Sequence, residues 1–185
     1  MTPGLDGSNM RYMMRSRTAL LFLCLGLGFT GCRSEKEPET DPTPLLTFDT
    51  GRVRLVTKTD TLSLVVEMAR TREQQTMGLM ERRRLADSAG MLFAYEATQP
   101  ETAAFWMFRT RIPLDIAFAD SAGVIRSIRQ MVPCEAATAA QCPTYPPDVP
   151  YRSALEVNAG YFARHRVVVG DRLIVSETRG SRGGH

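Results

Sequence analysis

Two acidic residues lie within apolar stretches of the chain and are its best candidates for chemistry. Asp115 lies in the stretch Leu114–Ala119, and Glu156 lies in Ser153–Val157. Both stretches have β-strand character, so their side chains alternate between two faces. On this alternation each carboxylate shares its face with alanines, which leave room for a ligand above a sheet.

If the two strands are neighbours, Asp115 and Glu156 are expected to share a cleft. Two carboxylates in different environments can act as acid and base, and a spacing of about 5–10 Å would suit glycoside hydrolysis. Oxygen-only cation binding by this pair is a further reading. The structural alternative stays open: Asp115 would accept hydrogen bonds from a turn near Thr110 or Arg111, and Glu156 would pair with Arg152 or with another arginine across the strands.

Aromatic residues could form the wall of such a site. Trp106 is the only Trp, and its neighbours Phe105 and Met107 favour packing in the core, with a stacking platform for a ligand as the alternative. Tyr145 and Tyr151 lie in or beside a proline-rich segment, which either walls a pocket or only stiffens a loop.

Several kinds of site are not indicated by the sequence. It has no Gly-x-Ser-x-Gly elbow and no glycine-rich phosphate or dinucleotide motif. His165 is the only histidine of the expected folded unit, so neither a metal site nor a cofactor is predicted. No long basic stripe is present, so nucleic acid is not an expected partner.

The N-terminus resembles the signal of a bacterial lipoprotein. Three arginines precede the apolar run Thr18–Phe29, which is too short to span a bilayer comfortably. The run ends in Gly31-Cys32, similar to a lipobox. The resemblance implies cleavage before Cys32 and lipidation of its thiol, which would anchor the chain to a membrane. An ordinary cleaved signal peptide is the alternative.

The chain therefore divides into four predicted parts. Residues 1–31 form the signal peptide, 32–46 the lipidated cysteine and a polar tether, 47–177 the folded domain, and 178–185 a disordered Gly- and Arg-rich tail. The formal charge of the 185 residues is +3, and removal of the signal leaves 20 basic and 19 acidic residues.

The remaining cysteines predict a disulfide. Cys134 and Cys142 form an even pair in a chain expected to reach an oxidising compartment. A metal site is the weaker alternative, because a second pair of ligands is missing.

Short β-rich runs alternate with turn residues through the folded part. One helix is expected at Thr71–Met80, where Thr71 and Gln74 form a capping box, and a short second helix at Ala159–His165. This content predicts a mainly β, jelly-roll-like sandwich or barrel with one or two short helices. The expected strands are Val53–Thr57, Leu62–Met68, Met91–Tyr95, Phe105–Phe108, Leu114–Ala119, Val124–Met131, Ser153–Val157 and Arg172–Val175.

Motifs in this order resemble the family called domain of unknown function 192. They run from about Val53 to Val175. The stretches that carry the resemblance are Gly78-Leu79-Met80, Gly90-Met91-Leu92-Phe93, Phe105-Trp106-Met107, Thr110 with Ile112-Pro113-Leu114-Asp115-Ile116, Ala154-Leu155-Glu156 with Gly160, and Gly170-Asp171.

The resemblance implies a jelly-roll β-sandwich and an exported protein, and it brings no established reaction. A cysteine-containing insert is also common in the family, in agreement with Cys134 and Cys142. One departure concerns a ligand site, because the family's Lys-Asn-Thr after Phe-Trp-Met is here Phe108-Arg109-Thr110. Arg109 would then supply a charged donor in place of the Asn.

The sequence thus predicts a lipid-anchored module, facing the periplasm or the cell exterior, that binds a small molecule, a glycan or an envelope partner. Its predicted ligand-binding residues are Trp106, Arg109, Thr110, Asp115 and Glu156. The alternatives are a hydrolase that uses Asp115 and Glu156 and a structural accessory protein of the envelope.

Overall fold

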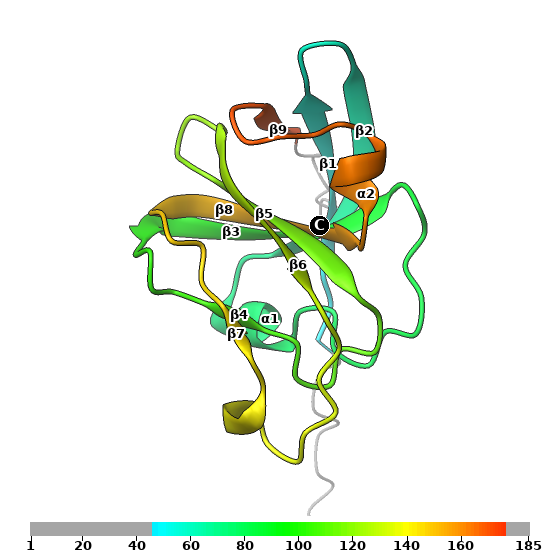
Figure 1. Cartoon of the computed structure of the whole chain (residues 1–185), viewed down its shortest axis with the longest axis vertical. Coiled ribbons are helices and arrows are strands. Elements are labelled where there is room, and N and C mark those ends of the chain that lie inside the picture. Colours follow the sequence, from blue (N-terminus) through cyan, green and yellow to red (C-terminus); the bar gives the residue numbers. More distant parts are fainter. Residues whose placement is uncertain (1–45, 177–185) are drawn as a thin grey trace, which may run out of the picture. The chain divides into compact units, whose positions relative to one another are not determined.

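Seven strands of the computed structural model form one curled sheet, a half-barrel, within residues 46–176, the part of the chain that the structure describes (Figure 1). The strands lie in the order β6-β5-β8-β3-β2-β1-β9. The pairing of β2 with β3 is parallel and the other pairings are antiparallel. The strands are β1 (Asp49–Val56), β2 (Thr61–Ala69), β3 (Ala89–Gln99), β5 (Leu114–Ala119), β6 (Ile125–Met131), β8 (Tyr151–Asn158) and β9 (Arg172–Ser176).

The two faces of this sheet carry separate hydrophobic clusters. Leu92 and Val157 belong to the cluster on the first face, which also receives Tyr161 and Phe162 of helix α2 (Tyr161–Arg164). Phe93 and Phe118 belong to the cluster on the second face. All six residues of β5 are buried, because this strand lies between the two clusters.

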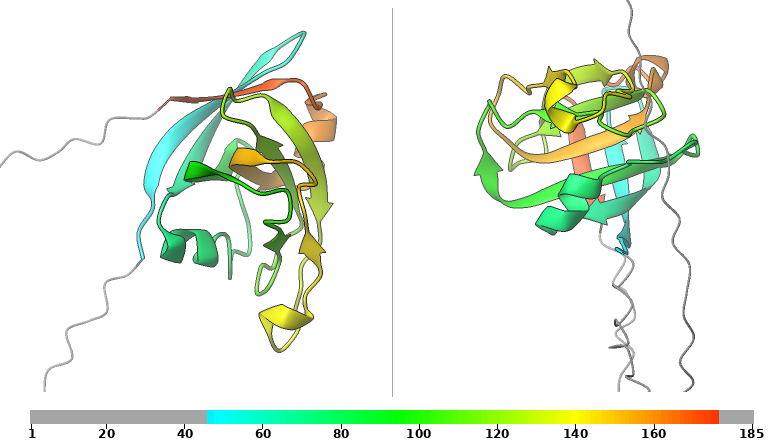
Figure 2. Two further views of the ribbon diagram at one scale, coloured as in Figure 1. Left: turned by 90° about the vertical axis from the view of Figure 1, so that its left-hand side faces the viewer. Right: turned by 90° about the horizontal axis from the view of Figure 1, so that it is seen from below.

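A second layer covers the second face. It consists of helix α1 (Arg72–Met77) and a ribbon of two short strands, β4 (Phe105–Trp106) and β7 (Thr144–Tyr145). Both elements lie on the same side of the curled sheet (Figure 2). One pocket lies between the second face and this covering layer, and a separate pocket is lined by first-face residues such as Leu92 and Leu173.

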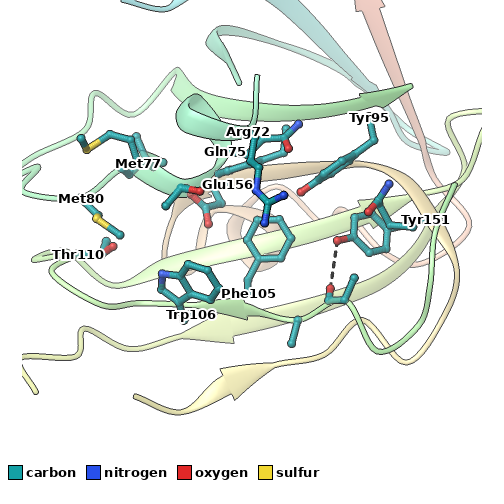
Figure 3. A pocket seen from close by; sticks show the side chains of 17 residues that line it. Arg72, Gln75, Met77, Met80, Tyr95, Phe105, Trp106, Thr110, Tyr151 and Glu156 are labelled. Atoms are coloured by element: carbon teal, nitrogen blue, oxygen red, sulfur yellow. Dashed lines mark hydrogen bonds between the residues drawn. The ribbon is translucent and has the colours of Figure 1, made fainter. Parts of the chain in front are cut away.

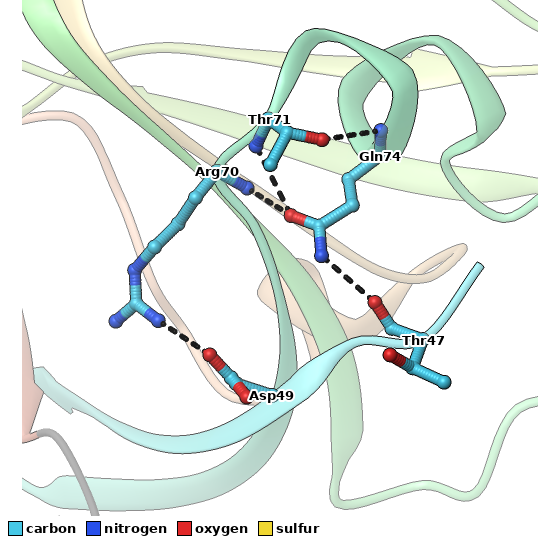
Figure 4. Close-up of polar contacts among 5 residues, drawn as sticks. All are labelled: Thr47, Asp49, Arg70, Thr71 and Gln74. Atoms are coloured by element: carbon cyan, nitrogen blue, oxygen red, sulfur yellow. Dashed lines mark hydrogen bonds and ion pairs between the residues drawn. The ribbon is translucent and has the colours of Figure 1, made fainter. Parts of the chain in front are cut away.

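The position of α1 is set by a network of hydrogen bonds at its N-terminus (Figure 4). Thr71 Oγ1 accepts from the Gln74 backbone N–H at 3.2 Å, and Gln74 Oε1 accepts from the Thr71 N–H at 3.0 Å. This is the predicted capping box. Gln74 Nε2 also donates to the Thr47 carbonyl at 2.8 Å, which attaches the helix to the segment that leads into β1.

The ribbon is tied down by the predicted disulfide, which the structure confirms. Cys134 and Cys142 are joined, with 5.8 Å between their Cα atoms. The bond closes the segment that contains the 3-10 helix η1 (Ala139–Gln141) and leads directly into β7. Since β7 pairs with β4, the disulfide holds in place the strand that carries Trp106.

The prediction of a mainly β fold with one or two short helices is confirmed. The predicted strand Leu114–Ala119 has the observed bounds of β5. The strand predicted at Phe105–Phe108 ends at Trp106, because Phe108 makes only an isolated bridge to Cys134. Helix α1 ends at Met77, since Gly78 adopts a φ of 48° and closes it. The strand β7 and the helix η1 were not predicted.

Some predictions lie outside the described residues. These are the signal peptide, the lipidation of Cys32, the tail 178–185 and the tether apart from Leu46. Within residues 46–176 no helix is long and apolar enough to cross a membrane. The described residues belong to one compact unit, residues 44–185.

Candidate functional site

A cavity of about 250 Å³ lies between the second face of the sheet and the layer that covers it (Figure 3). Its floor comes from β3 and β8, one wall from β4, and one rim from α1. This size is slightly below that of pockets that hold drug-sized ligands, about 300–1,000 Å³. The cavity is therefore suited to a small molecule rather than to a long chain.

Glu156 is the acidic residue of the cavity lining. It lies in the middle of β8, opposite Met91 on β3 and Ile116 on β5. Only 4% of its surface is exposed, and in residues 46–176 no group donates a hydrogen bond to its carboxyl. In the same part of the chain, every polar side-chain atom that is fully shielded from solvent has a hydrogen-bond partner. Because the Glu156 carboxyl has no such partner, its oxygens are not fully shielded and must border the cavity.

Burial changes the acidity of this carboxyl. Loss of solvation disfavours the charged form and raises the pKa of Glu156 from 4.5 to about 8. At neutral pH the group is therefore mostly protonated and can donate or accept a hydrogen bond. Perturbed acids in cavities are common in functional sites.

Aromatic side chains form the walls around Glu156. Phe105 packs edge-on against Phe93 and Phe118, with ring centroids 4.9 and 5.5 Å apart. Trp106 is 41% exposed at the mouth, so the prediction that it packs in the core is wrong. Its position agrees instead with the alternative of a platform for a ligand.

Two tyrosines face the same space from β3 and β8. Tyr95 and Tyr151 pack edge to face at 5.6 Å, and Tyr151 donates a hydrogen bond to the Ala103 carbonyl at 3.1 Å. Burial raises the pKa of both phenols, and for Tyr95 the nearby Tyr151 and the charge of Glu156 add to the effect. Both hydroxyls therefore stay neutral at physiological pH and remain hydrogen-bonding groups.

Helix α1 contributes two polar side chains to the rim. Gln75 is held by its own hydrogen bonds, since its amide donates to the Ala94 carbonyl at 3.2 Å. Arg72 is exposed and extends across the mouth (Figure 3), and among residues 46–176 it has no ion pair with an acid. The Arg72 guanidinium is therefore available to a ligand.

The expectation that Asp115 and Glu156 share a cleft is wrong. The register of β5 and β8 pairs Asp115 with Val157, so the Asp115 side chain lies on the same face as Val157. Glu156 is the residue before Val157 in β8, and its side chain therefore points to the opposite face. Asp115 is buried on the first face, where it accepts from the Phe162 backbone N–H at 3.4 Å and from Gln130 at 3.5 Å. Asp115 accepts no hydrogen bond from the turn near Thr110 and does not line the cavity. The two carboxylates therefore cannot act together as an acid and a base or as ligands of one cation.

The other predicted site residues are divided between the cavity and the surface. Thr110 is 5% exposed and lines the cavity. Arg109 instead donates to Glu81 at 2.7 Å on the surface and is not part of the lining. Its φ of 57° is left-handed, a conformation that Asn tolerates better than most residues. The Asn that the family resemblance implies at this position would therefore also suit this backbone.

Sequence reasoning did not identify Arg72, Gln75 or Tyr95 as site residues. Tyr151 was anticipated in a segment that either walls a pocket or stiffens a loop; it lines the cavity, and it is the first residue of β8. Arg152 donates to the Tyr95 carbonyl and not to Glu156. Within the described residues no group of three potential metal ligands lies together.

A family model and two solved structures match this chain. Residues 54–175 match the family DUF192, described as an uncharacterized ACR. A crystal structure from Sinorhizobium meliloti 1021, provisionally named a transcription regulator, is 38% identical, with a TM-score of 0.63 over 71% of this chain and 97% of that one. A protein of unknown function from Novosphingobium aromaticivorans DSM 12444 is 30% identical, with a TM-score of 0.61 over 71% and 89%. No curated protein shows significant similarity to the chain.

These matches also indicate that the domain folds alone. The match covers nearly the whole Sinorhizobium chain, which crystallised without a counterpart to the rest of this sequence. The compact unit 44–185 contains all of the matched residues. The resemblance noted in the sequence is confirmed, and the chain belongs to the domain of unknown function 192 family.

Proposed function

We propose that this protein is a lipid-anchored envelope protein whose domain binds a small polar molecule in the cavity above Glu156. The observation that supports binding is the buried Glu156 carboxyl, which borders a cavity and has no partner within residues 46–176. A buried polar group without a hydrogen bond costs about 1–3 kcal/mol. A ligand that completes its hydrogen bonds recovers this cost on binding.

The walls supply the rest of the binding energy. Phe105 and Trp106 offer apolar ring faces, and Thr110 and Tyr95 offer hydroxyl groups at the same cavity. A mainly apolar pocket with a few converging polar groups is the usual form of a small-molecule site. We assign binding rather than catalysis, because the second carboxylate expected for hydrolysis lies on the other face of the sheet.

The proposed location follows from the sequence signal at Cys32. Acyl chains contribute about 0.8 kcal/mol for each buried methylene, so two or three chains give a stable anchor. A polar segment between Cys32 and the domain would place the cavity outside the membrane. A monosaccharide, a small organic ion or a fragment of a glycan are all within the size range of the cavity.

Binding is tested by thermal denaturation of residues 44–185 with a library of small metabolites and sugars. A ligand at 100 times its Kd stabilises the native state by about 2.7 kcal/mol. We expect at least one compound to raise the Tm of the wild type and of Glu96→Gln, and to have no effect on Glu156→Gln. Glu96 is an exposed residue of the same strand, β3, as Tyr95, and it serves as the matched control. Compounds that stabilise all three proteins equally would refute a site at Glu156.

The anchor is tested separately in bacterial cells with an alkyne-labelled fatty acid. We expect labelling of the full-length wild type, loss of labelling in Cys32→Ala, and accumulation of an uncleaved precursor. Equal labelling of the two proteins, or a wild-type chain that keeps residues 1–31, would refute lipidation at Cys32.

A further inference from the structure

We infer that the cavity selects a small zwitterion of the α-amino acid type, with its ammonium group on Glu156 and its carboxylate on Arg72. This inference rests on the proposed function, because it names the class of ligand for the same site. It uses one feature that a general binding site does not require: the cavity has an acidic residue, Glu156, on its floor and a basic residue, Arg72, at its mouth.

The deep end of the cavity favours a positive charge. Glu156 is the acid there, 4% exposed and without a hydrogen-bond donor in the described chain. An ammonium group brings up to three donors and a charge that compensates the buried carboxylate. The faces of Phe105 and Trp106 also attract cations when they lie within about 6 Å of them.

The mouth of the cavity favours a negative charge. Arg72 extends over it from the first residue of α1, and the capping box and the Gln75 amide hold this helix against the sheet. The neighbouring acid, Glu73, is fully exposed and lies beside Arg72 in the chain. A guanidinium can bind a carboxylate through two parallel hydrogen bonds, which also orients the ligand.

The two charges together select against simpler ions. A ligand with only an ammonium group is repelled by the positive charge of Arg72. A ligand with only a carboxylate leaves Glu156 without a positively charged partner. A zwitterion satisfies both groups at once. Leu79, Met80 and Phe93 add an apolar surface to the lining, which is suited to an aliphatic or aromatic side chain.

The binding reaction predicts a measurable release of protons. Burial raises the pKa of Glu156 to about 8, so most of the carboxyl groups carry a proton at pH 7 in the free protein. Pairing with an ammonium group requires the ionised form. The other titratable or charged groups at the cavity are Tyr95, Tyr151 and Arg72. Burial raises the pKa of both tyrosines, so these two stay protonated at pH 7.

The test is calorimetric titration of residues 44–185 with leucine and phenylalanine, each in both enantiomers, and with their amides and N-acetyl forms. The amides lack the carboxylate and the N-acetyl forms lack the ammonium group. Measurements at pH 7 in two buffers of different ionisation enthalpy give the number of protons released. We expect at least one amino acid to bind, both of its derivatives to bind at least tenfold more weakly, and a large fraction of one proton to be released for each ligand bound.

Variants separate the two ends of the site. Glu156→Gln is expected to weaken the amino acid more than tenfold and to abolish proton release. Arg72→Ala is expected to weaken the amino acid severalfold and to leave the amide unchanged, while Arg83→Ala, which removes an exposed arginine outside the cavity, changes neither.

Three results would overturn the inference. They are an amide that binds as well as its amino acid, amino-acid binding without proton release, and no binding of any of the four amino acids at millimolar concentration. In each case the proposed function stands if a sugar or another compound still gives a Glu156-dependent thermal shift. It fails only when no compound in the library does so.

Discussion

Replacement of Glu156 by Gln should change how the stability of the domain depends on pH. Gln has almost the same shape as Glu and carries no charge, so the substitution removes only the titration of the buried carboxyl. In the wild type the folded-state pKa of about 8 lies above the ordinary value of 4.5. Between these values the native state binds more protons than the unfolded state, so stability falls as the pH rises.

The magnitude follows from the separation of the two pKa values. The interval from 4.5 to about 8, at about 1.4 kcal/mol for each pH unit, corresponds to roughly 5 kcal/mol when Glu156 is fully ionised. This loss begins above pH 4.5 and is complete above pH 8. Glu156→Gln lacks it, so the variant should become progressively more stable than the wild type over this range.

The assay is urea denaturation of residues 44–185 at intervals from pH 5 to pH 9. Other titrating groups contribute equally to both proteins, so only the difference in the free energy of unfolding is interpreted. We expect this difference to be small at pH 5 and to reach several kcal/mol at pH 9. Glu96→Gln should follow the wild type throughout. Parallel curves for wild type and Glu156→Gln would refute the assignment of Glu156 as a buried, unpaired acid.

Three further substitutions test how the fold holds the site. Replacement of Cys134 and Cys142 by Ala should reduce stability by about 2.5 kcal/mol on the loop-entropy model, measured by urea denaturation, and should weaken ligand binding because β7 supports β4. Thr71→Ala removes the cap of α1 and should cost about 1 kcal/mol, whereas Thr71→Ser should cost much less. Gly123→Ala places a Cβ 2.4 Å from the Leu173 carbonyl oxygen at a φ of +75°, and should lower stability by roughly 2 kcal/mol or more. A thermal midpoint equal to that of the wild type would contradict any of these three.

The strands were largely predictable because their pattern is local. The run Leu114–Ala119 is apolar apart from Asp115, and it is the fully buried strand β5. The capping box at Thr71 and Gln74 was likewise visible in four residues of sequence. The strand β7 was missed because its two residues are too few for an alternation to be recognised.

The candidate site was only partly predictable because it depends on the register between distant strands. Alternation fixes which residues share a face within one strand, but not which face of the next strand they join. A shift of one residue in the pairing of β5 and β8 would have brought Asp115 and Glu156 together; the observed pairing of Asp115 with Val157 separates them. Arg72 reaches the cavity through the packing of α1, which no spacing in the sequence indicates.

The ionisation of Glu156 can be observed directly by ¹³C NMR of the side-chain carboxyl carbon in glutamate-labelled residues 44–185. The signal that is missing from Glu156→Gln identifies the residue. We predict a titration midpoint near pH 8 in the free protein, and a shift of this midpoint to lower pH when a ligand that carries an ammonium group is bound. A midpoint between pH 4 and 5 in the free protein would show a solvated or paired carboxyl, and would contradict the cavity as a binding site built around Glu156.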